Sequence, residues 1–368
     1  MDKKYKVTVI GAGARGNIYL AMLKKYHADD IIFAGICDIL EDRLNKTYAE
    51  YGFAAKFTDY KQAIAESKPD IVIVAVPAFY HCDVASFAMD NGCHVLTEKP
   101  FDLSLKKCLN LKEKSKQTDR LLAIGLQYRN NMGNRSLKHM MDKRLIGKNV
   151  VMSFADIRQN RPKLAMHDAC FGNGGPMTDM ACHYFDLMRW YYGSDPKSVS
   201  AVWRISSEDR PYLASIKNKA PDSAVITVEY ESGDMGTMIL NWSLPVTNER
   251  SFHASSVTGS EGFVLPAELQ NPPELKVFSS GAEITIKPEP EDELDCVKAE
   301  KGVFDHLVAE IEGRGKVQAS FNEGILSLAA SMAAIKSGSL GRAVTIKEIL
   351  EGKPTVFECM NAKKLGEN

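Results

Sequence analysis

The chain has 368 residues, of which 45% are apolar, 25% charged and 8% aromatic, and this usage excludes a disordered or collagen-like protein. At roughly 150 residues per domain, the length predicts two domains. The 46 Lys and Arg residues balance 47 Asp and Glu residues, so no net field attracts nucleic acid or an anionic membrane surface. Neither is expected as a partner.

No segment of the sequence has the pattern of a membrane anchor or an export signal. The longest uninterrupted apolar run, Ile71 to Val76, has six residues, whereas a membrane-spanning helix needs roughly 20. The first residues pass into a strand pattern without the apolar region of a signal peptide. Eight scattered cysteines form no C-x-x-C pair, which indicates reduced, mostly buried thiols rather than disulfides or a structural zinc site. We therefore expect a cytoplasmic protein.

The first motif with chemical meaning is a strand, a glycine-rich turn and a helix. The β-rich run at 6–10 passes into G-A-G-A-R-G at 11–16, and helical spacing follows at 17–25. In such a motif one glycine makes the turn, one lets a pyrophosphate approach the backbone, and one allows the helix to pack closely on the strand. The phosphates would lie at the N-terminus of the helix. The motif alone is a weak indicator of dinucleotide binding, so the residue that ends the next strand is the test.

That next strand, at 31–37, runs into Asp38, which lies 22 residues beyond the last glycine of the turn. A carboxylate at this spacing accepts hydrogen bonds from the adenosine ribose and repels a 2′-phosphate. Ile39 and Leu40 supply no positive charge, and Arg43 fits a solvated face of the following helix. NAD is therefore favoured over NADP. A purely structural carboxylate is the less favoured interpretation of Asp38.

The order of the remaining elements predicts two different folds in one chain. Up to residue 127 strands and helices alternate, which predicts a doubly wound parallel sheet. Further strands are expected there at 70–76, 94–97 and 121–127, with helices at 84–91 and 103–116. Later helices are expected at 135–142, from 176 onward, at 303–312 and at 322–338, and later strands at 150–157, 199–206, 223–231, 236–244, 252–259 and 283–287. We predict a Rossmann domain at 1–127 and an α/β domain with a mostly antiparallel sheet at 128–368.

Lys99 lies where ligands of doubly wound sheets bind. It follows the predicted strand at 94–97, at the carboxyl edge of the sheet, and Pro100 disfavours a helix directly after that strand. An ammonium group beside a positively charged nicotinamide should have a lowered pKa, which suits proton transfer. An ordinary surface lysine is an equally good interpretation of the spacing.

A second group of polar residues follows Gly174 and Gly175. On one helix, Asp179, His183 and Asp186 fall on a single stripe, and a histidine with a carboxylate one turn before it suits acid/base chemistry. A buried structural histidine and a metal site on the same stripe remain open, but no H-E-x-x-H motif supports a metal, and we expect none. The two glycines either let a substrate approach the backbone or make the turn.

These motifs, in this order, resemble the Gfo/Idh/MocA family, named after glucose-fructose oxidoreductase, inositol dehydrogenase and a rhizopine-catabolism protein. The shared features are the glycine-rich turn, E-K-P at 98–100 and G-G-x3-D-x3-H-x2-D at 174–186. Further similarities at 77–81, 92–100, 257–262 and 339–346 extend the resemblance over most of the chain. It implies a Rossmann domain followed by an α/β domain with a large open, mostly antiparallel sheet. Because that sheet commonly forms oligomer interfaces, a homo-oligomer is expected.

The resemblance also implies roles for single residues. Lys99 matches the catalytic lysine, which hydrogen-bonds the reacting hydroxyl and the nicotinamide ribose, and Pro100 is expected in a cis peptide. His183 matches the acid/base and Asp179 its substrate-positioning neighbour. NAD is expected to contact Gly11, Gly13, Ala14, Arg15, Gly16, Asp38, Pro77, His81, Glu98 and Lys99. Further substrate contacts are expected from Gln127, Tyr128, Arg129 and His167. Tyr128 and Arg129 fit packing between domains equally well.

The activity implied is reversible oxidation of a ring secondary hydroxyl of a sugar, glycoside or inositol. Hydride passes to NAD, and the proton leaves through His183 or Lys99. Details at 173–183 favour C3 of a glucoside. Two alternatives remain: an NAD-dependent glycosidase that works by transient C3 oxidation and elimination, and an NAD-dependent regulator, against which the intact catalytic residues argue. The chain departs from many relatives at 78–80, Ala-Phe-Tyr, so a more aromatic lining on the nicotinamide side is expected.

Overall fold

The computed structural model describes residues 4–161, 163–245, 251–264, 275–286 and 296–352. The chain divides into two compact units. The first comprises residues 1–130 together with 295–325, and the second comprises residues 131–294 together with 326–368. A late segment of the chain thus belongs to the same unit as the N-terminal residues.

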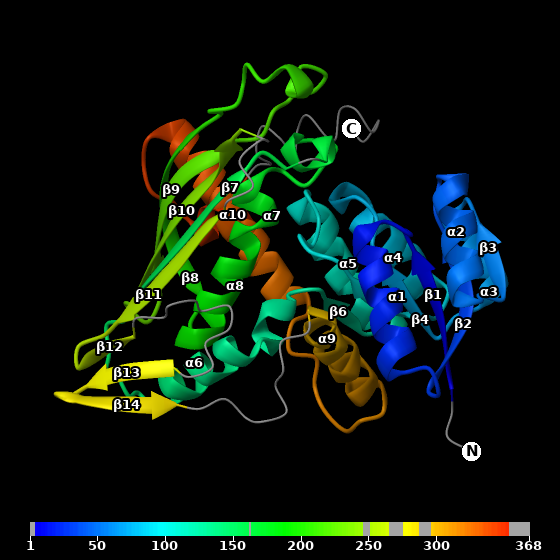
Figure 1. Ribbon diagram of the computed structural model, residues 1–368, viewed down its shortest axis with the longest axis horizontal. Helices are drawn as coiled ribbons and strands as arrows, with labels where there is room; N and C mark the ends of the chain where they lie inside the picture. The colour runs from blue at the N-terminus through cyan, green and yellow to red at the C-terminus, as the bar shows by residue number, and fades with distance from the viewer. Residues whose placement is uncertain (1–3, 162, 246–250, 265–274, 287–295, 353–368) are drawn as a thin grey trace. The chain divides into compact units, whose positions relative to one another are not determined.

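The first unit is built on a six-stranded parallel sheet in the order β3-β2-β1-β4-β5-β6. Its strands are β1 (Tyr5–Ile10), β2 (Ile31–Cys37), β3 (Ala55–Phe57), β4 (Ile71–Val74), β5 (His94–Thr97) and β6 (Leu122–Ile124). The connecting helices are α1 (Ala14–Tyr26), α2 (Glu41–Tyr51), α3 (Tyr60–Ser67), α4 (His81–Asp90) and α5 (Leu105–Thr118) (Figure 1). The predicted doubly wound sheet is confirmed. The strand order reverses between β1 and β4, where such sheets bind their ligands.

The late segment completes this unit. Helix α9 (Cys296–Ile311) packs against α1 (Figure 1), and Phe304 and Leu307 belong to the same buried core as Val7 and Ile73. Residues after α9 cover the edge strand β6, because Ile124 donates a backbone hydrogen bond to the carbonyl of Ala319 at 2.9 Å. An edge strand that is covered in this way cannot pair with another chain.

The second unit contains a nine-stranded sheet in the order β14-β13-β12-β11-β7-β10-β9-β8-β15. Its strands are β7 (Val151–Gln159), β8 (Pro196–Arg204), β9 (Ser223–Tyr230), β10 (Met235–Leu244), β11 (Phe252–Thr258), β12 (Gly262–Val264), β13 (Leu275–Ser279), β14 (Ala282–Ile286) and β15 (Val344–Thr345). The β7–β10 pair is parallel and the other pairings are antiparallel. The predicted mostly antiparallel sheet is confirmed.

Helices cover one face of this sheet. They include α6 (Met132–Asp142), α7 (Pro176–Asp179), α8 (Ala181–Tyr192) and α10 (Phe321–Leu340), which begins in the first unit (Figure 1). The short α11 (Ile346–Leu350) contacts β8 and the edge strand β15. Single 3₁₀ turns are η1 (Ala78–Tyr80), η2 (Gln127–Asn130), η3 (Leu164–His167) and η4 (Pro211–Leu213). Strand β9 alternates between buried and exposed residues along its length, as expected when one face of a sheet packs on helices.

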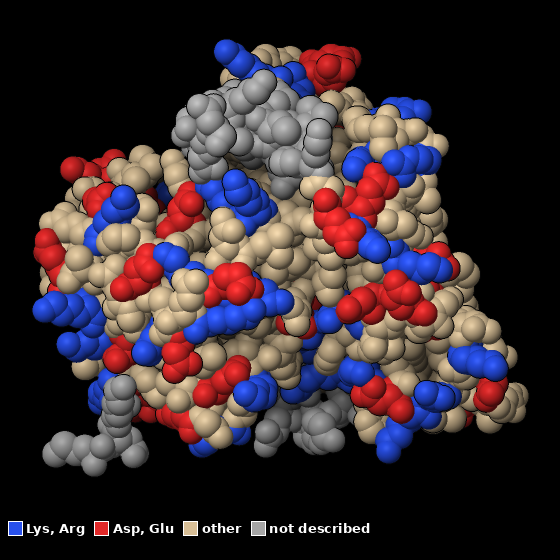
Figure 2. Space-filling view, turned by 180° about the vertical axis from the view of Figure 1, so that it is seen from behind, with Lys and Arg blue, Asp and Glu red and all other residues tan. Residues whose placement is uncertain are grey.

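The described part of the chain includes no helix that is both long enough and apolar enough to cross a bilayer. On the face seen in Figure 2, acidic and basic side chains are intermingled, which agrees with the near-zero net charge of the sequence. The cysteines at 37, 82, 93, 108, 170 and 182 are buried, as predicted. The side chains of Cys296 and Cys359 lie outside the described residues.

Candidate active site

The turn between β1 and α1 has the geometry that a dinucleotide requires. Gly11 has a φ of 102°, and a Cβ on it would lie 2.5 Å from the carbonyl oxygen of Ala75. A Cβ on Gly16 would collide with the carbonyl oxygen of Gly11, so this glycine permits the close packing of helix on strand. For Gly13, the nearest atom outside its chain neighbours would be Arg43 Nη1, at 3.7 Å. Its backbone is therefore open to a ligand, and the turn fits a pyrophosphate at the N-terminus of α1.

Asp38, at the end of β2, is tied to this turn. Its Oδ2 accepts a hydrogen bond from the backbone N–H of Ala12 at 2.9 Å, and Oδ1 accepts one from Leu40 at 2.9 Å. Arg43 Nη1 lies 3.4 Å from Oδ2, on a side chain that is 46% exposed. The carboxylate thus lies at the carboxyl edge of the sheet beside the glycine-rich turn, where the predicted contact with the ribose requires it.

Arg15, which the sequence assigns to the cofactor, is engaged by two carboxylates. Its Nε and Nη2 donate to Glu98 Oε1 at 2.9 and 2.6 Å, and Nη2 also donates to Glu300 Oε1 on α9 at 2.6 Å. The hydroxyl of Tyr19 donates to the same Glu98 oxygen at 2.8 Å. Burial opposes ionisation of Glu98, but Arg15, Lys99 and Tyr19 together hold the pKa of this carboxyl below its usual range.

Lys99 follows β5 and is partly exposed. The Lys99–Pro100 peptide is cis, as predicted. The backbone N–H of Lys99 donates to Glu98 Oε2 at 3.2 Å, and His81 Nδ1 lies 2.8 Å from the carbonyl oxygen of Pro100. The second ring nitrogen of His81 lies 2.9 Å from the carbonyl oxygen of Val76, and burial lowers the pKa of this imidazole. Side chains therefore hold the backbone on both sides of Lys99.

The segment before His81 carries the aromatic residues noted in the sequence. Pro77 is exposed, and the rings of Phe79 and Tyr80 on η1 have centroids 4.2 Å apart. An aromatic pair therefore follows the carboxyl end of β4. The predicted contacts of Pro77 and His81 with NAD remain predictions.

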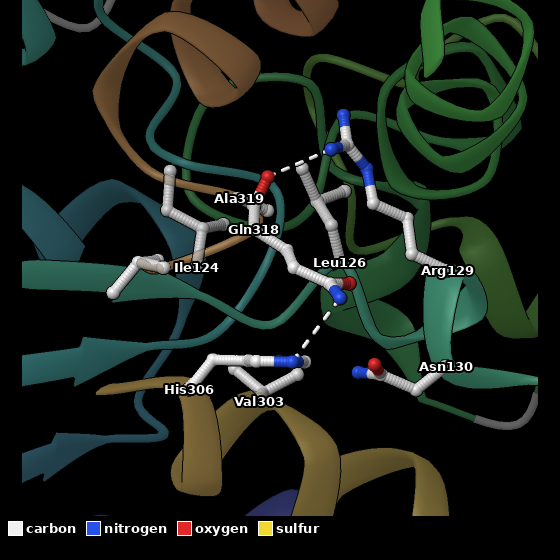
Figure 3. A pocket seen from close by; sticks show the side chains of 9 residues that line it. Ile124, Leu126, Arg129, Asn130, Val303, His306, Gln318 and Ala319 are labelled. Atoms are coloured by element: carbon white, nitrogen blue, oxygen red, sulfur yellow. Dashed lines mark hydrogen bonds between the residues drawn. The ribbon is translucent and has the colours of Figure 1, made fainter. Parts of the chain in front are cut away.

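Gln127, Tyr128 and Arg129 lie on η2, and Arg129 has a partner inside the first unit. Its Nη1 donates to the carbonyl oxygen of Gln318 at 2.7 Å, in a small pocket where the side chain of Gln318 lies 3.1 Å from His306 Nε2 (Figure 3). Arg129 is 5% exposed. This hydrogen bond links η2 to the segment at 295–325 within the first unit. The contact of Gln127, Tyr128 and Arg129 with substrate stays a prediction.

Asp179 and His183 lie in the second unit, on two consecutive helices. The predicted single helix from residue 176 is wrong in this detail, because α7 ends at Asp179 and α8 begins at Ala181. At the junction the N–H of His183 donates to the carbonyl of Met180, three residues earlier, at 3.0 Å, which tightens the turn. Asp179 and His183 are 4% and 3% exposed.

A residue before α7 holds the carboxylate of Asp179. Asn173 Nδ2 donates to Asp179 Oδ1 at 2.8 Å, a contact that the sequence analysis did not predict. Gly174 and Gly175 have φ values of 73° and 70°, and a Cβ on either would meet protein atoms, Thr178 Oγ1 and the carbonyl oxygen of Pro221, at 2.7 Å. These values fit a tight turn, and the approach of a substrate to this backbone stays a prediction.

The sequence analysis also did not predict Asp156, a buried carboxylate on β7. Asp156 is fully buried and accepts hydrogen bonds from Arg158 Nε at 2.7 Å and Trp242 Nε1 at 2.9 Å. Burial opposes ionisation, but His253, Arg158 and Trp242 hold the pKa of Asp156 well below its usual range. Arg158 Nη2 lies 3.8 Å from Met180 Sδ, at the junction of α7 and α8. The sequence did contain a signal for this site, because Asp156 occupies an inward-facing position of β7, where buried and partly exposed residues alternate.

His167, the remaining predicted substrate contact, is 3% exposed at the end of η3. Its Nε2 lies 2.9 Å from the carbonyl oxygen of Arg161, and burial lowers the pKa of the ring. The imidazole thus has a backbone partner within its own loop, and its contact with substrate stays a prediction.

Two family models match this chain. Residues 5–126 match the family model described as "Oxidoreductase family, NAD-binding Rossmann fold", and residues 134–264 match the Gfo/Idh/MocA C-terminal domain. The two matches together span more than half of the chain. The protein belongs to the Gfo/Idh/MocA family. It is therefore an oxidoreductase with an NAD-binding Rossmann unit, and the resemblance inferred from the sequence is confirmed.

Two relatives and one solved structure illustrate the similarity. The chain is 28% identical to myo-inositol 2-dehydrogenase of Thermotoga maritima over 63% of its length and 67% of the relative's. It is 22% identical to D-glucoside 3-dehydrogenase of Escherichia coli over 72% of its length and 78% of the relative's. An oxidoreductase from Agrobacterium radiobacter, solved with NAD+, L-tartaric acid and magnesium, superposes with a TM-score of 0.78 at 18% identity and covers 94% of this chain and 100% of its own. The superposition shows a shared fold.

Proposed function

We propose that the protein reversibly oxidises a ring secondary hydroxyl of a cyclitol, a sugar or a glycoside, with C3 favoured in a glycoside. The observation that carries this proposal is the buried pair of Asp179 and His183, whose carboxylate is held by Asn173. The relatives named as inositol and glucoside dehydrogenases support the same substrate class. NAD, held by the glycine-rich turn and Asp38, supplies the hydride acceptor when bound.

Three side chains carry the proton chemistry in this proposal. His183, as a neutral imidazole, accepts the proton of the reacting hydroxyl. Asp179 accepts a hydrogen bond from a neighbouring hydroxyl of the ring and so orients it. Lys99 donates a hydrogen bond to the reacting oxygen, which favours the developing alkoxide. The burial of Asp179 and His183 keeps bulk water away from both groups and strengthens their interactions.

The test is a combined cofactor and product assay. Purified protein is incubated with NAD+ and, separately, with myo-inositol, glucose and aryl glucosides, while NADH absorbance and products are followed. Net NADH together with a keto product supports the proposal. Release of free aglycone without net NADH would identify the NAD-dependent glycosidase, and bound NAD without any turnover would favour a regulator.

We also propose a homo-oligomer formed through the face of the nine-stranded sheet that no described helix covers, in a cytoplasmic protein with small-molecule substrates. Val202, Val225 and Ile239 are paired across β8, β9 and β10, and they are 60%, 54% and 46% exposed. Neighbouring apolar side chains that share an exposed face often mark a protein interface. These three exposed side chains support the proposed homo-oligomer.

A further inference from the structure

Arg15 joins three segments of the first unit that are far apart in sequence. It lies in the first turn of α1, within the glycine-rich motif, Glu98 directly precedes Lys99, and Glu300 belongs to α9. The guanidinium donates to Glu98 through Nε and Nη2, and Nη2 also reaches Glu300 at 2.6 Å. Charge-assisted forked contacts of this kind fix orientation as well as supplying energy.

The charge of Arg15 is already balanced. Both of its carboxylate partners are buried, Glu98 being 3% exposed and Glu300 1% exposed, while the Arg15 side chain is 31% exposed. A guanidinium that faces two carboxylates within hydrogen-bond distance offers little net positive charge to a pyrophosphate. Its place in the turn therefore does not make it a phosphate ligand.

Glu98 continues the contact toward Lys99. One carboxylate oxygen accepts from Arg15 and from the hydroxyl of Tyr19, and the other accepts from the backbone N–H of Lys99 at 3.2 Å. Space for this carboxylate is provided by Gly125, where a Cβ would lie 3.0 Å from Glu98 Oε1. An unbroken series of hydrogen bonds thus leads from the turn to the backbone of Lys99.

We propose that Arg15 is a positioning residue that holds Lys99 in place through Glu98, with Glu300 anchoring the guanidinium, and that it does not bind the pyrophosphate of NAD. The inference rests on the proposed catalytic role of Lys99. It changes the role expected for Arg15 and Glu98 from cofactor contact to support of the catalytic lysine. It also gives the late helix α9 a part in the reaction, since Glu300 reaches the turn from it.

The kinetic test compares Arg15→Met with Arg314→Met. Arg314 forms an exposed ion pair with Glu312 just after α9, so its variant makes the same substitution away from the glycine-rich motif. We expect Arg15→Met to lower kcat about tenfold or more, because small displacements of a catalytic group are costly, with the Kd for NAD+ changed less than about threefold. Arg15→Lys should recover part of the loss, and Arg314→Met should behave as wild type. A Kd raised about tenfold with kcat kept at saturating NAD+ would show that Arg15 is a phosphate ligand.

A second measurement needs no substrate. Hydrogen exchange is followed at 94–104 and at 10–18, with saturating NAD+, in wild type, Arg15→Met and Glu300→Gln. We expect faster exchange at 94–104 in both variants and retained protection at 10–18. Unchanged exchange at 94–104 would overturn the proposal. If Arg15→Met fails to fold, Arg15→Lys and Glu300→Gln make the same comparison.

The exchange data separate this proposal from the proposed function. If the wild type oxidises no sugar or cyclitol, the proposed function fails, while the exchange data still decide whether Arg15 holds the segment at 94–104.

Discussion

Lys99 and His183 are the side chains on which the proposed chemistry depends most directly. Replacing either with a group that cannot transfer a proton, as in Lys99→Met and His183→Asn, should lower kcat about a hundred- to ten-thousandfold. Binding of NAD+ should persist, because the glycine-rich turn and Asp38 are untouched. Steady-state kinetics and a NAD+ titration check both statements. Lys106→Met, an exposed lysine on α5, is the matched control, and full activity in His183→Asn would contradict the assignment.

Asp38 is expected to determine the choice between NAD and NADP. Asp38→Ser removes the carboxylate that repels a 2′-phosphate and releases Arg43, whose Nη1 lies 3.4 Å away, to bind that phosphate. The affinity for NADP+ should rise on the order of tenfold, and that for NAD+ should fall. Fluorescence titrations with both nucleotides measure the ratio. Asp42→Ser, an exposed carboxylate on α2, should leave the ratio unchanged, and an unaltered preference in Asp38→Ser would remove Asp38 from the cofactor site.

Asp156 is expected to stabilise the second unit in a pH-dependent way. In Asp156→Asn the partly buried Arg158 loses its charged partner, which should cost about 3 kcal/mol at pH 7. Because the folded state lowers the pKa of Asp156, its stabilising contribution is complete above the unfolded value of about 4 and decreases as the pH falls below it. Urea unfolding at pH 7 and at pH 3 should therefore show a smaller difference between wild type and variant at pH 3. An equal difference at both pH values would contradict this account.

At the level of elements, two glycines at the start of α1 have different roles: Gly16 allows close packing, and Gly13 leaves space for the ligand. Gly16→Ala should destabilise the protein by about 2 kcal/mol, because the new methyl group collides with the carbonyl of Gly11. Gly13→Ala should leave stability nearly unchanged and weaken NAD+ binding, because the methyl group occupies space that the pyrophosphate needs. Chemical unfolding and NAD+ titration of both variants test the pair. The opposite pattern would show that the roles of the two glycines are reversed.

The sequence predicted those elements whose signals are local. Strand β5 was predicted with the bounds it has in the structure, since a short apolar run is punctuated there by Gly92 and Pro100. Lys99 was selected because it follows a predicted strand and precedes a proline, and Asp179 and His183 were selected because they share one helical stripe after two glycines. Asn173 and Asp156 were missed because partners of each come from other elements, Asp179 on α7 for Asn173 and Trp242 on β10 for Asp156. The short strands β12 and β15 were not predicted because they have too few residues to show the two-residue alternation of a β-strand. They are defined by their pairing with β11 and β8.

At the scale of the whole molecule, the exposed apolar side chains of β8, β9 and β10 predict self-association through the nine-stranded sheet. A double variant, Val225→Glu with Ile239→Glu, places two charges in register on neighbouring strands and should convert an oligomer to monomers without unfolding the sheet, since both side chains are exposed. Sedimentation velocity measures the change. Leu109→Glu, an exposed apolar residue on α5, is the control, and an unchanged assembly in the double variant would place the interface elsewhere.

The late segment at 295–325 affects how the protein is made. Helix α9 and the residues that cover β6 belong to the first unit, yet residues 131–294 are synthesised before them. At about 5–20 residues per second, the ribosome needs roughly ten to thirty seconds to add that intervening stretch. During this interval the nascent Rossmann sheet has an open edge at β6, and Arg15 lacks Glu300. Newly made chains should therefore depend on chaperones most strongly in the period before residue 325 leaves the exit tunnel.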